Sequence, residues 1–206
     1  GLNHEAAAAY ARKMDPTRPL HYEGAIRGSW MGGHSLTDVI CPMYPSINAI
    51  TTYAKSGKQD RPLIMCEYSH AMGNSNGTLA EYWNAIETLP GLQGGFIWEM
   101  WDHGPVQTLP DGSKRNAYGG DYGETKHDGN FCCDGMVFPD RTAKPAMHEM
   151  KALAAPAKIA TTKASSGQFT IFNKQFFTGI EDFDLLWSIT RDGLVVDGGR
   201  VKLPAV

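Results

Sequence analysis

The stretch at residues 62–74, P-L-I-M-C-E-Y-S-H-A-M-G-N, decides how the rest of the chain is interpreted. It opens with a short apolar run at 63–66, which is typical of a strand buried on both faces. The run stops at a carboxylate, Glu67. A charge at the end of a buried strand is costly unless it is used, and parallel barrels carry their reacting groups at the carboxyl ends of their strands. We therefore expect Glu67 to be functional.

Segments with strand and helix character alternate on both sides of this stretch. Strong helix formers indicate helices, and we expect them at residues 4–14, 46–55, 78–89 and 146–154. Apolar runs indicate strands at residues 20–23, 38–43, 63–66 and 94–98. Asn3 is the expected N-cap of the first helix, and Pro42 is expected to mark the end of its strand or a bulge.

Polar or aromatic side chains stand where these strands end: Glu23, Tyr44, Glu67 and Trp98. Alternating strands and helices of this length predict parallel βα units. No Gly-rich phosphate loop is present to favour a doubly wound sheet. The predicted fold class is α/β, with residues 1–155 forming the C-terminal half of a TIM (β/α)8 barrel.

The character of the sequence changes after Pro156. Apolar and polar residues alternate in Q-F-T-I-F-N at 168–173 and F-D-L-L-W-S-I at 183–189, and R-D-G at 191–193 supplies a turn. This pattern predicts antiparallel strands, and we expect residues 156–206 to begin an all-β immunoglobulin-like sandwich. Residues 104–134 are rich in Gly, Asp and Asn and are expected to form a long ordered loop.

Composition narrows the possible partners and the compartment. The chain has 206 residues, 42% of them hydrophobic and 20% charged, which is typical of a globular protein. A formal charge of −3 without a Lys/Arg cluster gives no footprint for nucleic acid. No apolar run approaches the roughly 18 residues of a membrane span. Cys41, Cys66 and the adjacent pair at 132–133 indicate free thiols more than a disulfide or zinc framework, which favours the cytoplasm.

Taken together, these residues resemble the β-galactosidases of glycoside hydrolase family 2. The motifs that carry the resemblance are I-C-P-M-Y at 40–44, C-E-Y-S-H-A-M-G-N-S at 66–75, L-Q-G-G-F-I-W-E at 92–99, A-Y-G-G-D-Y-G-E at 117–124 and F-C-C-D-G-M-V-F-P-D-R-T at 131–142. They span most of residues 1–155. The tail resembles the sandwich domain that follows the barrel in this family, with weaker motifs.

The resemblance implies a retaining glycosidase that cleaves terminal β-D-galactosides, such as lactose, through a covalent galactosyl-enzyme intermediate. Glu67 matches the nucleophile of the family, and Tyr44 matches a tyrosine that hydrogen-bonds it. His70 matches a contact to the 6-hydroxyl of galactose, and Trp98 matches a platform for the face of the sugar ring.

The resemblance also implies metal ions. Phe131, through its backbone carbonyl, and Asp134 match a sodium site that touches the same 6-hydroxyl. A known member of the family carries Asn at the Asp134 position, and Asp should bind the cation at least as well. A magnesium ion is implied near the acid/base, with all of its ligands outside this chain.

The acid/base itself is expected just upstream of Gly1. In the family this glutamate lies in an N-E-S-G motif, a few residues before the helix that begins here at Asn3. We therefore expect the chain to be a fragment of a longer enzyme, inactive alone. The expected partners are the β-galactoside substrate, the remaining domains and further copies in a homo-oligomer.

Other interpretations stay open from the sequence. A different family 2 specificity, β-glucuronidase or β-mannosidase, is the nearest alternative, and a non-catalytic carbohydrate-binding or structural fragment is another. Glu67 alone could be a buried structural glutamate, His70 a loop histidine and Trp98 a core side chain. The strand-end acids Glu23, Glu99 and Asp102 could either support the site or be ordinary loop charges.

Overall fold

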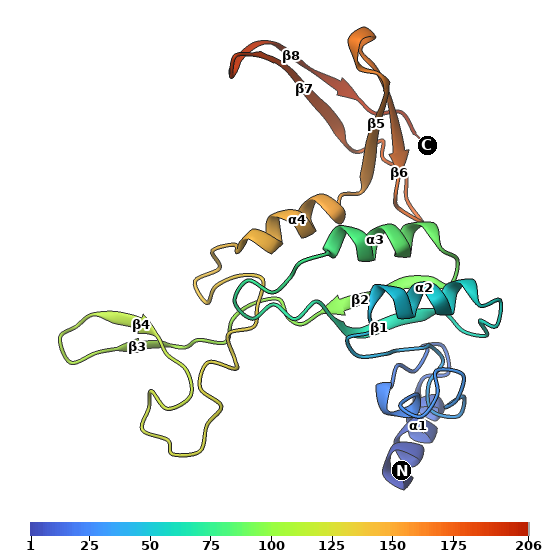
Figure 1. Cartoon of the computed structure of the whole chain (residues 1–206), viewed down its shortest axis with the longest axis vertical. Coiled ribbons are helices and arrows are strands. Elements are labelled where there is room, and N and C mark those ends of the chain that lie inside the picture. Colours follow the sequence, from blue (N-terminus) through green and yellow to red (C-terminus); the bar gives the residue numbers. More distant parts are fainter. Residues whose placement is uncertain (206) are drawn as a thin grey trace. The chain divides into compact units, whose positions relative to one another are not determined.

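The computed structural model describes residues 1–205 and divides into two compact units, Gly1–Leu153 and Ala154–Val206 (Figure 1). The first unit contains α1 (Leu2–Met14), the 3-10 turn η1 (Glu23–Ala25), α2 (Ile47–Lys55), β1 (Leu63–Tyr68), α3 (Leu79–Thr88), β2 (Leu92–Ile97), β3 (Val106–Thr108), β4 (Lys114–Asn116) and α4 (Pro145–Leu153). The second contains β5 (Ala157–Lys163), η2 (Ala164–Ser166), β6 (Gln168–Asn173), β7 (Asp184–Arg191) and β8 (Leu194–Lys202).

Parallel pairing organises the first unit. Strands β1 and β2 pair in parallel, and residues 40 and 43 form parallel bridges to Leu63 and Glu67 on the other edge of β1. Beyond β2, residues 99–102 run parallel to 134–137, with Glu99 N–H donating to Asp134 O at 2.8 Å. The α/β class predicted from the sequence is confirmed. Residues 1–205 contain no closed barrel.

Two helices cover β1 and β2 and enclose the core. Helix α2 begins after Ser46, whose hydroxyl accepts a hydrogen bond from Ala49 N, and α3 packs against β2 and against α2 and α4 (Figure 1). The buried side chains of this core include Ile50, Tyr53, Leu63, Met65, Tyr68, Leu79 and Leu92. Over residues 63–66 the side chains of β1 alternate between buried and half-buried, where the prediction had both faces buried.

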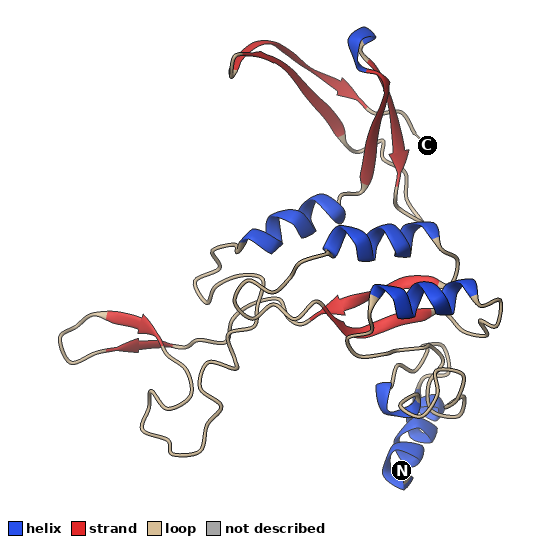
Figure 2. Ribbon diagram, viewed as in Figure 1, coloured by secondary structure: helices blue, strands red, loops and turns tan. Residues whose placement is uncertain are grey.

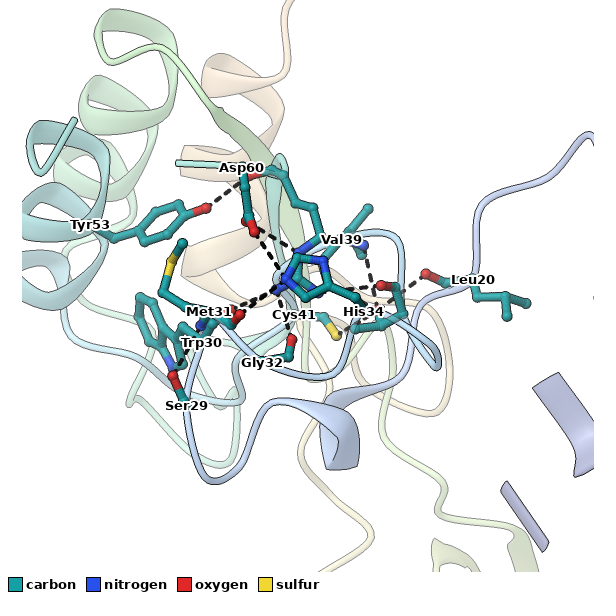
Figure 3. A network of polar contacts seen from close by, with 12 residues as sticks. Leu20, Ser29, Trp30, Met31, Gly32, His34, Val39, Cys41, Tyr53 and Asp60 are labelled. Carbon is teal, nitrogen blue, oxygen red and sulfur yellow. Dashed lines mark hydrogen bonds and ion pairs between the residues drawn. The ribbon is translucent and has the colours of Figure 1, made fainter. Parts of the chain in front are cut away.

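A buried arginine fixes the loop that leads into residues 38–43. The Arg61 side chain, 8% exposed, donates hydrogen bonds to the carbonyls of Trp30 at 3.0 Å and Gly32 at 2.7 Å. Its own carbonyl accepts a hydrogen bond from the Tyr53 hydroxyl, and Asp60 pairs with His34 beside it (Figure 3). The loop is thereby attached to the amino end of β1.

The second unit is built from antiparallel hairpins, β5–β6 and β7–β8 (Figure 2). The turn between β7 and β8 uses Asp192 and Gly193, both with positive φ, as a two-residue hairpin loop requires. The predicted strands at 168–173 and 183–189 and the turn are confirmed. Each hairpin is a separate two-stranded sheet in the described residues, so the sandwich stays a prediction.

Several local predictions are wrong. Residues 20–23 form no strand: Leu20 O accepts from Asp38 N, and the chain then turns into η1. Residues 38–43 contribute only isolated bridges, because Pro42 has no N–H to donate to a ladder. Helix α1 starts at Leu2, so Asn3 lies inside its first turn and Gly1 is the N-cap. None of the helices in residues 1–205 is long and apolar enough to cross a membrane.

Candidate active site

The carboxyl end of β1 places Glu67 beside Tyr44. Tyr44 N–H donates to the Glu67 carbonyl at 2.9 Å, and the Tyr44 hydroxyl lies near enough to the Glu67 carboxylate for that carboxylate to raise the pKa of Tyr44. The backbone of Tyr44 is left-handed, with φ of 47°, a conformation that non-glycine residues adopt mainly where surrounding structure enforces it. Burial, and then contact with the Glu67 carboxylate, raise the pKa of Tyr44, so the phenol keeps its proton and remains a donor.

A thiol precedes the carboxylate on the same strand. Burial raises the pKa of Cys66 to about 11, so its side chain is neutral near pH 7. A neutral thiol is a poor nucleophile, because the thiolate is the reactive form. Glu67 is therefore the better candidate for nucleophilic attack at this strand end.

A buried carboxylate lies in the next parallel segment. Asp134 is 2% exposed, and its Oδ2 accepts a hydrogen bond from Trp98 Nε1 at 3.0 Å and lies 3.7 Å from His70 Nε2. Its other oxygen, Oδ1, is buried without a hydrogen-bond partner. An unsatisfied buried oxygen is costly and calls for an explanation, such as an ion or a substrate hydroxyl.

Aromatic contacts join the two carboxylates into one site. The His70 ring stacks on Phe131 with centroids 5.8 Å apart and meets the edge of Tyr44 at 6.1 Å. Trp98 is 40% exposed, so part of its ring is available to a ligand. The structure thus brings together every site residue expected from the sequence, and their roles stay a prediction.

Glu99 lies beside Asp134. Burial, and then the adjacent Asp134 carboxyl, raise the pKa of Glu99, while His103 Nε2 at 3.4 Å from its Oε2 acts in the opposite direction. The side of the site near Trp98 therefore places two acidic groups next to each other. It suits a cation or a neutral hydroxyl donor and disfavours an anionic ligand group.

The structure also shows a pair that sequence reasoning missed. Lys144 Nζ lies 2.8 Å from Asp102 Oδ1, and both side chains are buried. Asp102 was one of the strand-end acids of open role. The sequence does not mark Lys144 as a buried residue, because a lysine in the polar stretch before α4 resembles an ordinary surface residue.

Known proteins resemble the chain along nearly its whole length. Residues 1–159 match the family described as "Glycosyl hydrolases family 2, TIM barrel domain". A β-galactosidase of Photobacterium profundum is 38% identical over 98% of this chain and 20% of its own length. One of Priestia megaterium is 38% identical over 96% of this chain and 19% of its own length. A solved β-glucuronidase from Faecalibacterium prausnitzii has 19% identity over 56% of this chain and 21% of its own, with a TM-score of 0.33.

The chain thus spans about a fifth of the length of the curated relatives that it matches. The family match covers more than the whole first unit, from α1 through α4 and into β5. The parallel strands, the helices that cover them and this match agree, and the chain belongs to glycosyl hydrolase family 2.

Proposed function

We propose that this chain carries the nucleophile and part of the sugar-binding site of a retaining β-galactosidase. The observation that carries the proposal is the Tyr44–Glu67 pair at the end of a parallel strand. The His70 ring contacts Tyr44 on one side and lies 3.7 Å from the buried Asp134 carboxylate on the other. The curated relatives with about 38% identity bear the name β-galactosidase, which supports this specificity within the family.

The proposed chemistry is a double displacement. Glu67 attacks the anomeric carbon, the bond to the leaving oxygen breaks, and a glycosyl ester forms on Glu67. A second carboxylate protonates the leaving oxygen and later deprotonates the water that cleaves the ester, so the anomeric configuration is retained. We assign this second carboxylate to polypeptide outside residues 1–206, about 5 to 5.5 Å from Glu67 in the assembled site.

Tyr44 would orient the nucleophile. Its hydroxyl lies beside the Glu67 carboxylate, and a hydrogen bond between them would restrict the rotation of the carboxylate. Because burial and the Glu67 charge raise the pKa of Tyr44, the hydrogen bond persists throughout the neutral range.

The Asp134 cluster would set the choice of sugar. Asp134 Oδ1 and His70 can hydrogen-bond a neutral 6-hydroxyl, and Trp98 can stack on the apolar face of the ring. A glucuronide carries a carboxylate at the same carbon. It would meet the buried Asp134 carboxyl group and be repelled.

The unpartnered Asp134 Oδ1 also fits the sodium ion that the family resemblance implies, because Na⁺ binds oxygen ligands. Asp134 and the Phe131 carbonyl would hold it. When bound, the ion would offset the buried charge and polarise a sugar hydroxyl. The ligands of the magnesium ion that the resemblance implies are proposed to lie elsewhere in the polypeptide.

The proposal is tested with the complete enzyme that contains this chain. We expect hydrolysis of 4-nitrophenyl β-D-galactoside, with the β-anomer of galactose appearing first by NMR, and negligible hydrolysis of the β-glucuronide. Glu67→Gln should lower kcat by about four orders of magnitude or more, since the nucleophile is lost. The exposed Glu81 on α3 provides the matched control, Glu81→Gln. Initial release of the α-anomer, or a preference for the glucuronide, would contradict the proposal.

A further inference from the structure

The segment that carries Asp134 is fixed along its whole length by backbone hydrogen bonds. Asp134 O accepts from Glu99 N at 2.8 Å, and Met136 N donates to Glu99 O at 2.9 Å. Val137 follows the same ladder, with its carbonyl accepting from Asp102 N at 2.9 Å. Gly135, between these residues, donates its N–H to a side chain instead.

That side chain is Asp102, and it is shared with Lys144. Asp102 Oδ1 accepts from Gly135 N at 2.8 Å and from Lys144 Nζ at 2.8 Å. Lys144 also donates its own backbone N–H to Met136 O at 3.0 Å. The Asp102 side chain therefore holds the N–H of the peptide that follows Asp134, and the Lys144 backbone holds the Met136 carbonyl just after it.

Close contact at Gly135 makes the position of this backbone segment sensitive to substitution. A Cβ built on Gly135 would lie 2.0 Å from the carbonyl carbon of Trp101 and 2.3 Å from Asp102 N, so only glycine fits. A charged pair this well buried, 8% and 6% exposed, is a costly way to gain stability alone. Asp102 of this pair accepts the hydrogen bond from Gly135 N–H, and Gly135 directly follows Asp134 in the chain.

We propose that Lys144 and Asp102 are positioning residues that hold Asp134 in place for the sugar 6-hydroxyl. Lys144 neutralises and orients Asp102, Asp102 fixes the Gly135 N–H, and this peptide sets the direction of the Asp134 side chain. The inference rests on the proposed function, because it assumes that Asp134 contacts the substrate.

The test compares two substrates that differ only in that hydroxyl, 4-nitrophenyl β-D-galactoside and its 6-deoxy analogue, the β-D-fucoside. In the complete enzyme, Lys144→Met should lower the ratio of kcat/KM for galactoside to that for fucoside about tenfold, as loss of an orienting partner does. Lys144→Arg, which keeps the charge, should restore part of the ratio. Lys151→Met, at an exposed position of α4, is the matched control and should leave the ratio unchanged.

A second variant guards against misfolding. Asp102→Asn combined with Lys144→Met leaves no unpaired buried charge, so it should fold and show the same loss of discrimination. If these variants lower kcat/KM equally for both substrates, with the ratio unchanged, the pair only supports the fold and the inference is wrong. An unsubstituted enzyme that does not discriminate between the substrates would overturn the assigned contact between Asp134 and the 6-hydroxyl, and the positioning role with it, while the nucleophile assignment is tested separately by Glu67→Gln.

Discussion

At the scale of single residues, the site depends on the hydrogen-bond partners and the burial of two carboxylates, Glu67 and Asp134. Glu67 lies beside a tyrosine that stays protonated and can donate to it, which suits a carboxylate held for attack. Asp134 keeps one oxygen buried and unpartnered, which suits a ligand atom. The His70 ring contacts the rings of Tyr44 and Phe131. Because Glu67 is proposed to attack the sugar and Asp134 to bind it, substitutions of the two carboxylates should affect different kinetic parameters.

Replacing Tyr44 by phenylalanine tests the orientation of the nucleophile. Tyr44→Phe removes the hydroxyl that restrains Glu67 and should lower kcat about 100-fold, with a small effect on KM. Steady-state kinetics of the complete enzyme measure both parameters. Tyr10→Phe, at an exposed position of α1, is the control. A Tyr44→Phe enzyme with unchanged kcat would show that this hydrogen bond does not contribute to the reaction.

Strand ends and motifs mark, in the sequence, the residues that the structure brings together around Glu67, and their roles stay a prediction. The sequence does not predict their support. Lys144 is far from Asp102 in sequence and has no periodic or motif signal, so only the folded structure shows that both are buried together. The free oxygen of Asp134 depends on its neighbours in space and is equally invisible in the sequence.

At the scale of elements, the close approach of β1 and β2 fixes the strand end that carries Glu67. Gly95 in β2 makes this approach possible: a Cβ there would lie 2.8 Å from Met65 Cβ and 3.0 Å from Tyr68 Cδ1. Both neighbours are buried and cannot move away easily. The spacing of the two strands thus depends on the absence of one side chain.

Substituting Gly95 by alanine should therefore destabilise the protein. Gly95→Ala overpacks the contact between β1 and β2, and we expect a loss of about 2 kcal/mol in the free energy of unfolding, measured in urea. Gly28→Ala is the matched control, because a Cβ at Gly28 meets nothing within 4 Å. Equal stability of the two variants would mean that β2 shifts freely away from β1.

Arg61 supports a separate prediction for the loop before residue 38. Its guanidinium donates to the carbonyls of Trp30, Gly32 and Thr37. Arg61→Met leaves these acceptors without a donor and should lower the free energy of unfolding by about 3 kcal/mol. Arg18→Met is the comparison, since the Arg18 side chain is 82% exposed. Similar unfolding midpoints for both variants would contradict the assigned role of Arg61.

Elements with strong periodicity or apolar runs are predicted best. Helices α2, α3 and α4 and strands β1, β6 and β7 occur where the pattern indicates them. The hairpin of β3 and β4 was missed, because its strands, V-Q-T and K-R-N, lack an apolar face, although Asp111-Gly112 between them is a turn signal. The strand predicted at residues 38–43 is reduced to isolated bridges at residues 40 and 43, because Pro42 has no N–H to donate.

At the scale of the whole molecule, large apolar side chains remain exposed in the described residues. Leu2, Phe176 and Phe177 are 83%, 90% and 98% exposed. Large exposed apolar side chains that gather in patches mark surfaces that bind other polypeptide. The proposed function, in which further polypeptide supplies the acid/base, would give these exposed side chains a surface to pack against.

The isolated chain of 206 residues provides a direct test of that proposal. It should bind the dye ANS strongly, through its exposed apolar side chains, and hydrolyse a chromogenic β-galactoside only near background, because the proposed acid/base lies elsewhere. Activity should appear when the rest of the polypeptide is added. Full activity of the chain alone would place the acid/base within these residues.

The central claim is that Glu67, held at the end of β1, forms the bond to the sugar. The most direct measurement is to inactivate the complete enzyme with an activated 2-deoxy-2-fluoro-β-D-galactoside, digest it and locate the modified residue by mass spectrometry. We predict that the fluorosugar is recovered as an ester on Glu67. Recovery on any other residue, such as Glu99, would contradict the account.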